Sequence, residues 1–508
     1  MSEQIRIQPI ATTTLQLLLQ VAQHVQNQHE HAYLVGGSLR NLLLQEPCSD
    51  WDIAASGDAP KLARQLANKL DGFYAHLHDK ANRVVVKQTQ PEIIFDIAPL
   101  DGTTIEEDLN RRDFTINALA VPLTNFVEHL TNGSPLALID TTSGLNDLHT
   151  RSLRAVNEQV LQQDPLRMLR AIRFMMQYHL TIEQTTEDLI KRDAHLLLKA
   201  APERIHEEMY AILRPQGATQ RLRYMDRLRL LTTLIPEFTP ARGMRQPGLH
   251  QWDVLEHSLE AVAALERFAD VMRQHSEQVA TNEMGDLAPL RTLLDEAERQ
   301  GIFTRADLTS PVMKLAALLH DIGKPVTHAI DNEGNIHFYH HPQAGVPLAQ
   351  TIMQRMSASV HDRRLVQQVV ANHMRPGQLS SGTLTQRAIR RYFVDLGPVG
   401  INVALVSLAD HLAMRGLQPL TEHWTNHLTT VVALLHTYIR ERQRIMPPRL
   451  LQADELISRL KLTPGPIIGQ LLEAIAEAQA EGSIHSKEDA LWLAHEKLQQ
   501  DAVQEPSS

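Results

Sequence analysis

The chain has 508 residues, 43% of them hydrophobic, and this length predicts about three or four domains. A single cysteine, Cys48, excludes an internal disulfide, and no apolar run approaches the roughly 18 residues of a membrane-spanning helix. We therefore expect a cytoplasmic protein with no membrane contact. Because the formal net charge is −10, any nucleic acid must be bound by local basic patches.

Residues 1–30 are predicted to contain one N-terminal helix, and a candidate ligand site follows in the stretch YLVGGSLRNLLLQEPCSDWD (33–52). It predicts a short strand, a glycine turn, a helix and a second strand. Paired glycines let the backbone approach a ligand, and the helix start offers unpaired N–H groups to phosphate oxygens. The GGSLR unit therefore predicts nucleotide binding by Gly36, Gly37, Ser38 and Arg40.

Two carboxylates lie on one face of the second strand. Side chains alternate along a strand, so Asp50 and Asp52 share a face while Trp51 and Ile53 point to the other. Two such carboxylates can hold a pair of Mg²⁺ ions, which suits phosphoryl transfer. The alternative is a hairpin strand with two solvated acids, because an isolated D-x-D pattern is common.

Asp96 is the only acid in the apolar strand IIFDIA. A lone carboxylate there is costly unless it is compensated. A metal shared with Asp50 and Asp52 would compensate it, and so would an ion pair with an arginine such as Arg83. Strands and helices across residues 31–150 predict a catalytic domain with a small mixed sheet flanked by helices.

The stretch EEDLNRRDFTINALA (106–120) carries two adjacent arginines. Arg111 and Arg112 offer fork-shaped donors suited to a triphosphate. Asp113 and Asn117 are four residues apart, which would place them on one helix face, where they could fix a ribose hydroxyl or hold the arginines. The alternative is a capped helix with a solvated charge run.

The stretch QDPLRMLRAIRF (163–174) begins an all-helical region, residues 151–236. Asp164 marks a helix start, and Arg167, Arg170 and Arg173 recur along one side. An acid and an arginine three apart present an acceptor and a fork of donors, which can address the edge of a nucleobase. A solvated arginine stripe is the alternative.

The third region, residues 237–445, is rich in histidines and acids with the stretch MKLAALLHDIGKP at its centre. Imidazoles and carboxylates together suit a divalent ion that activates water for phosphoester hydrolysis. Buried structural histidines are the alternative. The candidate ligands are His257, His320, Asp321, His340 or His341, His373 and Asp410. A helical tail is predicted for 446–495 and disorder for 496–508.

Four motifs in consecutive order resemble those of class II tRNA nucleotidyltransferases, a family of CCA-adding enzymes and bacterial poly(A) polymerases: the Gly-Gly turn with Asp50 and Asp52, RRDFTINALA, DTTSGLNDL and QDPLRMLRAIRF. The third region resembles the HD phosphohydrolase superfamily. The resemblance implies an α+β head with a small mixed sheet, followed by all-α neck, HD and tail domains.

The resemblance also implies addition of C, C and A to the tRNA 3′ end from CTP and ATP, without a nucleic-acid template. Asp50, Asp52 and Asp96 would hold Mg²⁺ in the head, and Mg²⁺ or a divalent transition metal would occupy the HD site. Asp164 and Arg167 would pair with the incoming base. Two positions depart from the family pattern: Gln163 stands where Glu is frequent, and Asp96 where Glu is frequent.

Three alternatives remain open. A poly(A) polymerase, or an enzyme that adds only CC or only A, would share these residues. An HD phosphohydrolase with an RNA-binding head would use the third region instead. An inactive RNA-binding scaffold would use neither site.

Overall fold

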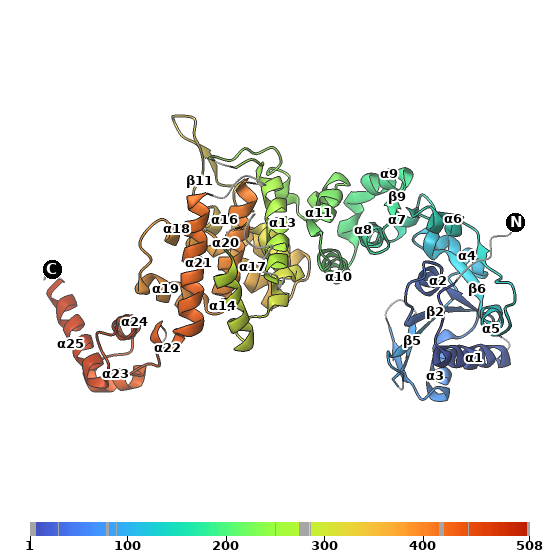
Figure 1. The fold of residues 1–508 in the computed structure, drawn as a ribbon, viewed down its shortest axis with the longest axis horizontal. Coiled ribbons are helices and arrows are strands. Elements are labelled where there is room, and N and C mark those ends of the chain that lie inside the picture. The colour runs from blue at the N-terminus through green and yellow to red at the C-terminus, as the bar shows by residue number, and fades with distance from the viewer. Residues whose placement is uncertain are drawn as a thin grey trace. The chain divides into compact units, whose positions relative to one another are not determined.

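The computed structural model describes residues 7–28, 30–77, 81–87, 89–248, 250–273, 284, 286–415, 421–445 and 447–504. The chain divides into two compact units, Met1–Glu208 with Met225–Leu234, and Met209–Tyr224 with Ile235–Ser508 (Figure 1). Each unit has its own architecture.

A mixed sheet of seven strands forms the start of the first unit, in the order β3-β4-β5-β2-β1-β6-β7. Only β2 and β5 are parallel neighbours in this sheet, and all its other pairs are antiparallel. The strands are β1 (Ala32–Val35), β2 (Asp50–Ala55), β3 (Phe73–His76), β4 (Asn82–Val86), β5 (Ile93–Pro99), β6 (Leu119–Pro122) and β7 (Ile139–Asp140).

Burial alternates along β2 as the sequence predicts. Trp51 and Ile53 are each 1% exposed, whereas Asp50 is exposed and Asp52 is half-buried. The ring of Trp51 packs against Phe126, and Asp58 caps α3 by accepting a hydrogen bond from the Lys61 N–H. The helices around the sheet are α1 (Thr12–Asn27), α2 (Gly36–Leu43), α3 (Ala59–Lys69), α4 (Ile105–Arg111), α5 (Leu123–Asn132) and α6 (Gly144–His149). The sequence also predicts a turn at Asp79–Lys80, and these two residues lie outside the described ranges.

The predicted helix face that carries Asp113 and Asn117 is wrong. The helix α4 ends at Arg111, Phe114 makes an isolated β-bridge with Ala155, and Thr115–Asn117 forms a short 3₁₀ turn. Phe114 is fully buried and meets Phe174 edge to face, so burial of this ring outweighs continuation of the helix.

Helices follow the sheet in the first unit: α7 (Val160–Gln163), α8 (Arg167–Gln177), α9 (Gln184–Asp193), α10 (Pro202–Leu213) and α12 (Leu230–Leu234). The chain passes into the second unit within α10. Two short strands, β8 (Ser152–Leu153) and β9 (Thr181–Ile182), pair in parallel beside α8. The predicted α+β head followed by helical domains is confirmed.

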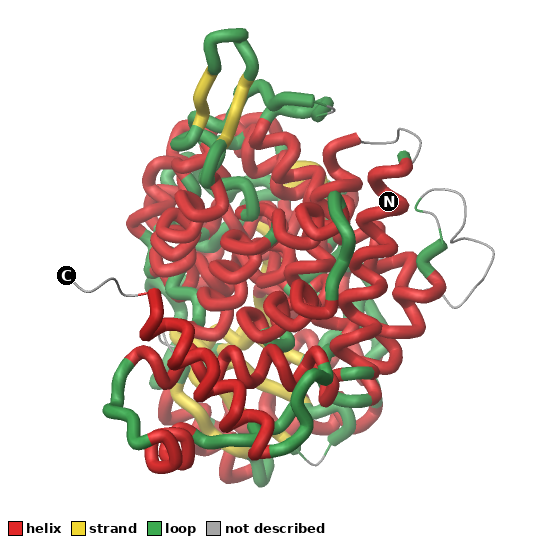
Figure 2. Tube along the Cα trace, turned by 90° about the vertical axis from the view of Figure 1, so that its left-hand side faces the viewer, coloured by secondary structure: helices red, strands yellow, loops and turns green. Residues whose placement is uncertain are grey.

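The described part of the second unit is helical apart from the hairpin of β10 (His328–Ile330) and β11 (Ile336–Phe338), which stands out from the surrounding helices in Figure 2. Its helices up to the tail are α11 (Ala218–Arg227), α13 (Val254–Arg273), α14 (Ala288–Arg299), α15 (Pro311–Leu319), α16 (His341–Arg355), α17 (Val360–Asn372), α18 (Met374–Ser380), α19 (Gln386–Leu396), α20 (Val399–Arg415), α21 (Glu422–Arg440) and α22 (Arg442–Ile445). Among the described helices none is by itself long and apolar enough to cross a membrane; only the bent pair 386–396 and 399–414 meets that test jointly.

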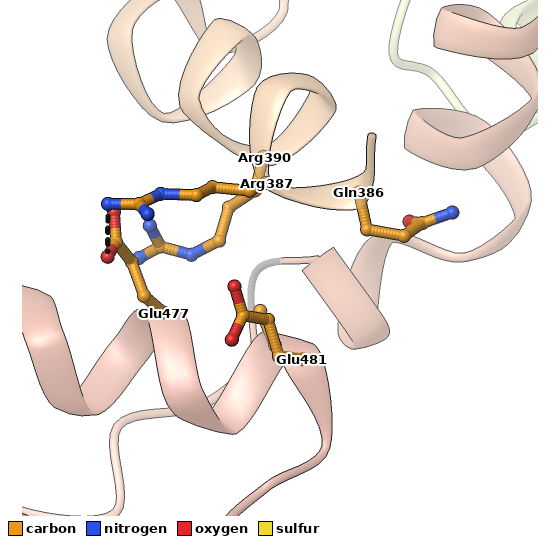
Figure 3. Close-up of a pocket in the computed structure, with 6 residues that line it drawn as sticks. Gln386, Arg387, Arg390, Glu477 and Glu481 are labelled. Atoms are coloured by element: carbon orange, nitrogen blue, oxygen red, sulfur yellow. Dashed lines mark ion pairs between the residues drawn. The ribbon is translucent and has the colours of Figure 1, made fainter. Parts of the chain in front are cut away.

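The tail comprises α23 (Ala453–Leu460), α24 (Pro466–Glu481) and α25 (Lys487–Gln504) around a small apolar core of its own. Figure 3 shows Arg387 of α19 reaching toward Glu477 of α24, with the two charges 3.1 Å apart. Disorder was expected from residue 496, but α25 continues to Gln504. Leu498 packs against the tail core, which explains the longer helix.

Candidate functional site

Three carboxylates share one face of the head sheet. The register between parallel strands β2 and β5 places Asp52 opposite Asp96, and Asp50 lies two residues before Asp52. Residues that pair across parallel strands point to the same face, so all three side chains project together. Burial raises the pKa of Asp52, and the charge of Asp96 adds to this rise, although the backbone N–H of Ser38 opposes it. Crowded carboxylates of this kind are a suitable donor set for a hard divalent cation.

The glycine turn lies against this face. Gly36 has φ +62°, and a Cβ added to it would lie 2.8 Å from Nη1 of Arg112. A Cβ on Gly37 would lie 3.0 Å from Oδ2 of Asp52. Only glycine at both positions leaves the space between the arginine and the carboxylate open. The turn therefore brings the backbone close to both Arg112 and Asp52.

Ser38 joins α2 to β2. Its backbone N–H donates to Asp52 Oδ2 at 3.2 Å, and its hydroxyl donates to the Asp50 carbonyl at 3.0 Å. The same hydroxyl accepts from the Asp52 N–H. Ser38 thereby fixes where the two acids lie relative to the glycine turn.

Asp96 also has a cationic neighbour. Arg83, on the adjacent strand β4, donates from Nε to Asp96 Oδ1 at 2.8 Å and from Nη2 to Oδ2 at 2.7 Å. The ion pair considered as an alternative from the sequence is thus present. Its two partners face the same side of the sheet as Asp52, so the pair is part of the site.

A buried hydrogen-bonded chain runs from α2 to α8. Arg40 donates from Nη1 to Asn117 Oδ1, and Asn117 donates to Asp113 Oδ1 at 2.8 Å. Arg170 closes the chain from α8, with Nη2 2.9 Å from Asp113 Oδ2. Burial alone would raise the pKa of Asp113, but Arg170 and Asn117 hold it below its ordinary value. Four predicted nucleotide-binding residues are therefore brought together, and their mutual hydrogen bonds connect the helix after the glycine turn to α8.

The sequence analysis did not identify two aromatic residues that contact this hydrogen-bonded chain of side chains. The guanidinium of Arg40 lies 4.2 Å from the ring centroid of Tyr178 and donates to its hydroxyl at 2.6 Å. Phe174 flanks the same guanidinium at 5.2 Å. The two rings are four residues apart, and this helical spacing beside the arginine stripe was an available signal.

The adjacent arginines each pair with an acid, one before α4 and one within it. Arg111 lies 3.1 Å from Asp101, and Arg112 lies 2.8 Å from Asp108. About half of the Arg111 side chain is exposed, whereas Asp108 is buried. Because Arg112 also borders Gly36, one guanidinium faces the glycine turn and the other faces solvent.

The two predicted base-reading residues lie at the start of α8, each held by a different element. Asp164 accepts from the Leu166 N–H at 3.2 Å and from Arg204 Nη2 at 2.9 Å. Arg167 donates to the carbonyl of Arg111 at 2.9 Å and to that of Val160 at 3.2 Å. Burial lowers the pKa of Arg167, and Asp113 and Asp164 counteract this.

The HD candidates form two groups that share Asp321: His257, His320, Asp321 and Asp410, then Asp321, His341 and His373. Within each group, one donor atom from every residue lies within 4.8 Å of the others. Nε2 of His257 lies 2.9 Å from Asp410 Oδ1, and Nε2 of His341 lies 3.2 Å from Asp321 Oδ1. The exposed His340 is the N-cap of α16 and belongs to neither group.

These side chains meet the requirements of a metal site. Both ring nitrogens of His257, Nε2 of His320 and Oδ2 of Asp321 are buried without a hydrogen bond of good geometry. The Nδ1 atoms of His320, His341 and His373 each lie 2.7–2.9 Å from a carbonyl, of Ala317, Phe338 and Val370. Such contacts orient the opposite nitrogen toward a metal. Burial opposes a charge on His320, yet Asp321 and Asp410 raise its pKa to about 10.

The HD cluster opens into a cavity of about 330 Å³. Its wall includes Lys324, whose ammonium lies 2.5 Å from Asp321 Oδ2 and 2.6 Å from Gln246 Oε1. Sequence reasoning missed Lys324 and other residues of the wall, although HDIGK already places a lysine three residues after Asp321. Besides Lys324 and four of the candidate ligands, the residues of the wall that carry polar or aromatic side chains are His250, Phe338, Tyr339, Ser407, His411 and His427.

Three family models match the chain. The poly A polymerase head domain matches residues 32–103 and 98–154, the probable RNA and SrmB-binding site of polymerase A matches 179–242, and the HD domain matches 254–415. The A-adding tRNA nucleotidyltransferase of Deinococcus radiodurans is 31% identical over 465 residues, which cover 90% of this chain and 94% of that protein. The CC-adding tRNA nucleotidyltransferase of Thermus thermophilus is 31% identical over 470 residues, 90% of this chain and 92% of that protein.

A solved structure has a similar fold. The Thermotoga maritima CCA-adding enzyme complexed with tRNA aligns with 96% of each chain at a TM-score of 0.57 and 21% identity. At that identity the likeness concerns the fold alone.

Proposed function

The chain belongs to the tRNA nucleotidyltransferase family, and we propose that it adds C, A or both to the 3′ end of tRNA from CTP and ATP, without a nucleic-acid template. The observation that carries the proposal is the shared face of Asp50, Asp52 and Asp96 beneath the Gly36–Gly37 turn. A cytoplasmic location is proposed with this activity, because such an enzyme acts on tRNA.

The three head carboxylates are the proposed ligands of Mg²⁺, an ion that prefers oxygen donors and substrate phosphates. Bound there, Mg²⁺ would stabilise charge on the attacking 3′ oxygen and on the departing pyrophosphate. Ser38 holds Asp50 and Asp52 in register with the glycine turn. The turn lets the triphosphate approach the backbone, and Arg112 beside Gly36 neutralises phosphate charge. Arg111 and Asp113 complete the proposed contacts to triphosphate and ribose.

Asp164 and Arg167 are the proposed readers of the incoming base. Cytosine and adenine carry an exocyclic amino group where uracil and guanine carry a carbonyl. The Asp164 carboxylate accepts hydrogen bonds only, so it favours the amino-bearing bases. Arg167 supplies donors for the neighbouring ring nitrogen. The buried chain through Asp113 and Arg170 fixes the helix that carries both residues.

The relatives do not distinguish between the products. The A-adding and the CC-adding relatives described above are equally identical to this chain. We propose complete CCA addition as the leading activity, because both reactions use the residues found here. An enzyme that adds only part of CCA and a poly(A) polymerase are the alternatives, which product length and composition separate.

A second activity is proposed for the HD cluster, on the observation that its imidazoles are oriented by backbone carbonyls while their other nitrogens converge on Asp321 and Asp410. The proposed reaction is hydrolysis of a phosphoester. A bound divalent metal would activate the water there. Lys324 at the cavity wall would neutralise the substrate phosphate.

The decisive experiment supplies tRNA transcripts that end before CCA, after C or after CC, together with CTP, ATP or both. Sequencing gels should show CCA completion by the wild-type chain. Asp52→Asn should lower the rate by about 1,000-fold, because it removes a ligand charge at the reacting phosphate. Asp188→Asn, which changes an acid whose side chain is 62% exposed, is the matched control and should retain the rate. A wild type that adds nothing, or an unimpaired Asp52→Asn, would refute the proposal.

A further inference from the structure

One face of α10 carries the partners of the base-reading segment. Arg204 and Glu208 are four residues apart on this helix and therefore lie on the same side. Arg204 Nη2 lies 2.9 Å from Asp164 Oδ2, and Nη1 lies 3.5 Å from Oδ1. Glu208 accepts from Arg173 through both of its oxygens, at 2.7 and 3.2 Å. The arginine and the glutamate on α10 thus pair with residues of opposite charge, Asp164 before α8 and Arg173 within it.

The carboxylate of Asp164 is held from two directions. The Leu166 N–H fixes Oδ1, and the guanidinium of Arg204 fixes Oδ2. Each carboxylate oxygen can accept about two hydrogen bonds, so Oδ2, which accepts from Arg204 Nη2, keeps one acceptor position for a base. The two contacts therefore define the plane of the carboxylate without consuming its capacity to bind a base.

Gln163, the residue directly before Asp164, is exposed. Within the described residues, the hydrogen bonds that hold the Asp164 side chain come from Leu166 and Arg204, and none comes from Gln163. The orienting group supplied from outside the QDPLR segment is therefore the arginine on α10.

We propose that Arg204 is a positioning residue that sets nucleotide choice by orienting Asp164. The ligand it discriminates is the Watson–Crick edge of the incoming base, with an amino group accepted and a carbonyl rejected. The inference rests on the proposed function, in which Asp164 reads that edge. Arg204 acts through Asp164 and does not itself contact the base.

The exposure of the pair makes this role separable from folding. The Arg204 side chain is 44% exposed and that of Asp164 is 27% exposed. Exposed ion pairs contribute little to stability, so loss of Arg204 should leave the fold intact. A carboxylate that is free to rotate, however, loses the fixed acceptor geometry on which discrimination between an amino group and a carbonyl depends. A lysine retains the charge of Arg204 but lacks its planar fork.

The test measures single-turnover incorporation of each of the four nucleotides into tRNA lacking CCA, for the wild type, Arg204→Ala, Arg204→Lys, Asp164→Ala and the double variant Asp164→Ala/Arg204→Ala. The expected result for Arg204→Ala is a loss of about 10-fold in the preference for CTP over UTP and for ATP over GTP. Arg204→Lys should recover part of this preference. Adding Arg204→Ala to Asp164→Ala should change selectivity no further, because the arginine acts through the carboxylate. Arg227→Ala is the control, since it removes another exposed arginine paired with an acid, Glu187, and should keep full selectivity.

Two results would overturn the inference, and they differ from failure of the proposed function. If Arg204→Ala kept wild-type selectivity while Asp164→Ala lost it, Asp164 would still read the base, but Arg204 would not be its positioning residue. Equal further loss on adding Arg204→Ala to Asp164→Ala would show that the arginine acts independently of the carboxylate. A wild type without transferase activity would refute the proposed function itself. Thermal unfolding midpoints within about 2 °C of the wild type would exclude misfolding as the cause of lost selectivity.

Discussion

Arg83 and Asp96 form a two-pronged ion pair on adjacent strands, directly beside the Asp52 side chain. Both oxygens of Asp96 accept from the guanidinium, so the arginine occupies the carboxylate that is proposed to complete the Mg²⁺ site. The hydrogen bond and the charge of Asp96 raise the pKa of Arg83, against the effect of burial. Arg83 is therefore a permanent cation that competes with a divalent ion for the same oxygens.

Arg83→Met should reduce this competition. The substitution keeps much of the length of the side chain and removes its charge. An ion pair of this exposure contributes up to about 1 kcal/mol, which corresponds to about 5-fold in binding. The Mg²⁺ concentration for half-maximal nucleotide addition should fall by that factor. A titration that gives the same midpoint as the wild type would show that Asp96 does not bind the ion.

Substitutions in the HD cluster should impair metal binding and hydrolysis without affecting nucleotide addition. His341→Ala removes one donor to the group around Asp321, whereas His340→Asn changes the neighbouring histidine outside both groups. Asparagine tolerates the positive φ of 60° at position 340. His341→Ala should bind less metal, measured by elemental analysis after dialysis, and should lose hydrolysis of a chromogenic phosphodiester.

Nucleotide addition should stay at the wild-type rate in both HD variants. His340→Asn should match the wild type in metal content and in hydrolysis. If His341→Ala and the wild type bound the same amount of metal, the cluster would be structural.

A buried ion pair beside α15 should make a large contribution to the stability of the second unit. Lys314 is fully buried, with Nζ 2.7 Å from Glu266 Oε1 and 2.7 Å from the Leu213 carbonyl. Glu266 in turn accepts from the N–H groups of Gly217 and Ala218 at 3.1 Å. The two charges thereby satisfy the backbone groups between α10 and α11.

Lys314→Ala leaves the Glu266 charge buried without its partner. Loss of one member of a buried pair costs about 3–5 kcal/mol. The transition of the second unit in urea, followed by tryptophan fluorescence and hydrogen exchange, should shift accordingly. The matched control Arg387→Ala removes a guanidinium that is 66% exposed from its pair with Glu477, and should cost less than about 1 kcal/mol. Equal effects of the two substitutions would contradict the assignment.

Local patterns predicted much of the site. Alternation along β2 placed Asp50 and Asp52 on one face, and the spacing of Arg167, Arg170 and Arg173 predicted α8. These features depend on residues close in sequence, where strand and helix periods act directly. The order of the HD motifs likewise indicated ligands that the structure brings within 4.8 Å of one another in two groups.

Partners distant in sequence could not be obtained in this way. Arg204 is 40 residues from Asp164, and Tyr178 is 138 residues from Arg40. No helix or strand periodicity in the sequence marks either pair, because both contacts depend on how separate helices pack. The prediction that Asp113 and Asn117 share a helix face was wrong for a related reason. Burial of Phe114 against Phe174 determines the backbone conformation there, and the ring of Phe174 comes from another element. Helix propensity, which is a property of the local sequence, does not include this contribution from tertiary packing.

The acid sensitivity of the second unit should depend in part on His427. This imidazole is 4% exposed, and burial together with neighbouring His411 lowers its pKa to about 4. The hydroxyl of Ser407 donates to the Ala404 carbonyl, so it accepts from Nε2–H of a neutral His427. The unfolded imidazole, with a pKa near 6.5, binds a proton more readily than the folded one. Stability is therefore fully present above about pH 6.5 and is lost as the pH falls toward 4.

Between pH 7.5 and 5.5 this single group should account for a loss of about 1 kcal/mol. His427→Gln removes the titration, so its thermal midpoint should fall less over this interval than that of the wild type. The variant will also lose stability at every pH, because the contacts to Ser407 and His411 change, and only the difference between the two pH values tests the assignment. His423→Gln, which alters an exposed histidine on the same helix α21, is the control and should reproduce the wild-type loss. If His427→Gln lost as much stability between these pH values as the wild type, a buried neutral His427 would not be the source of the acid sensitivity.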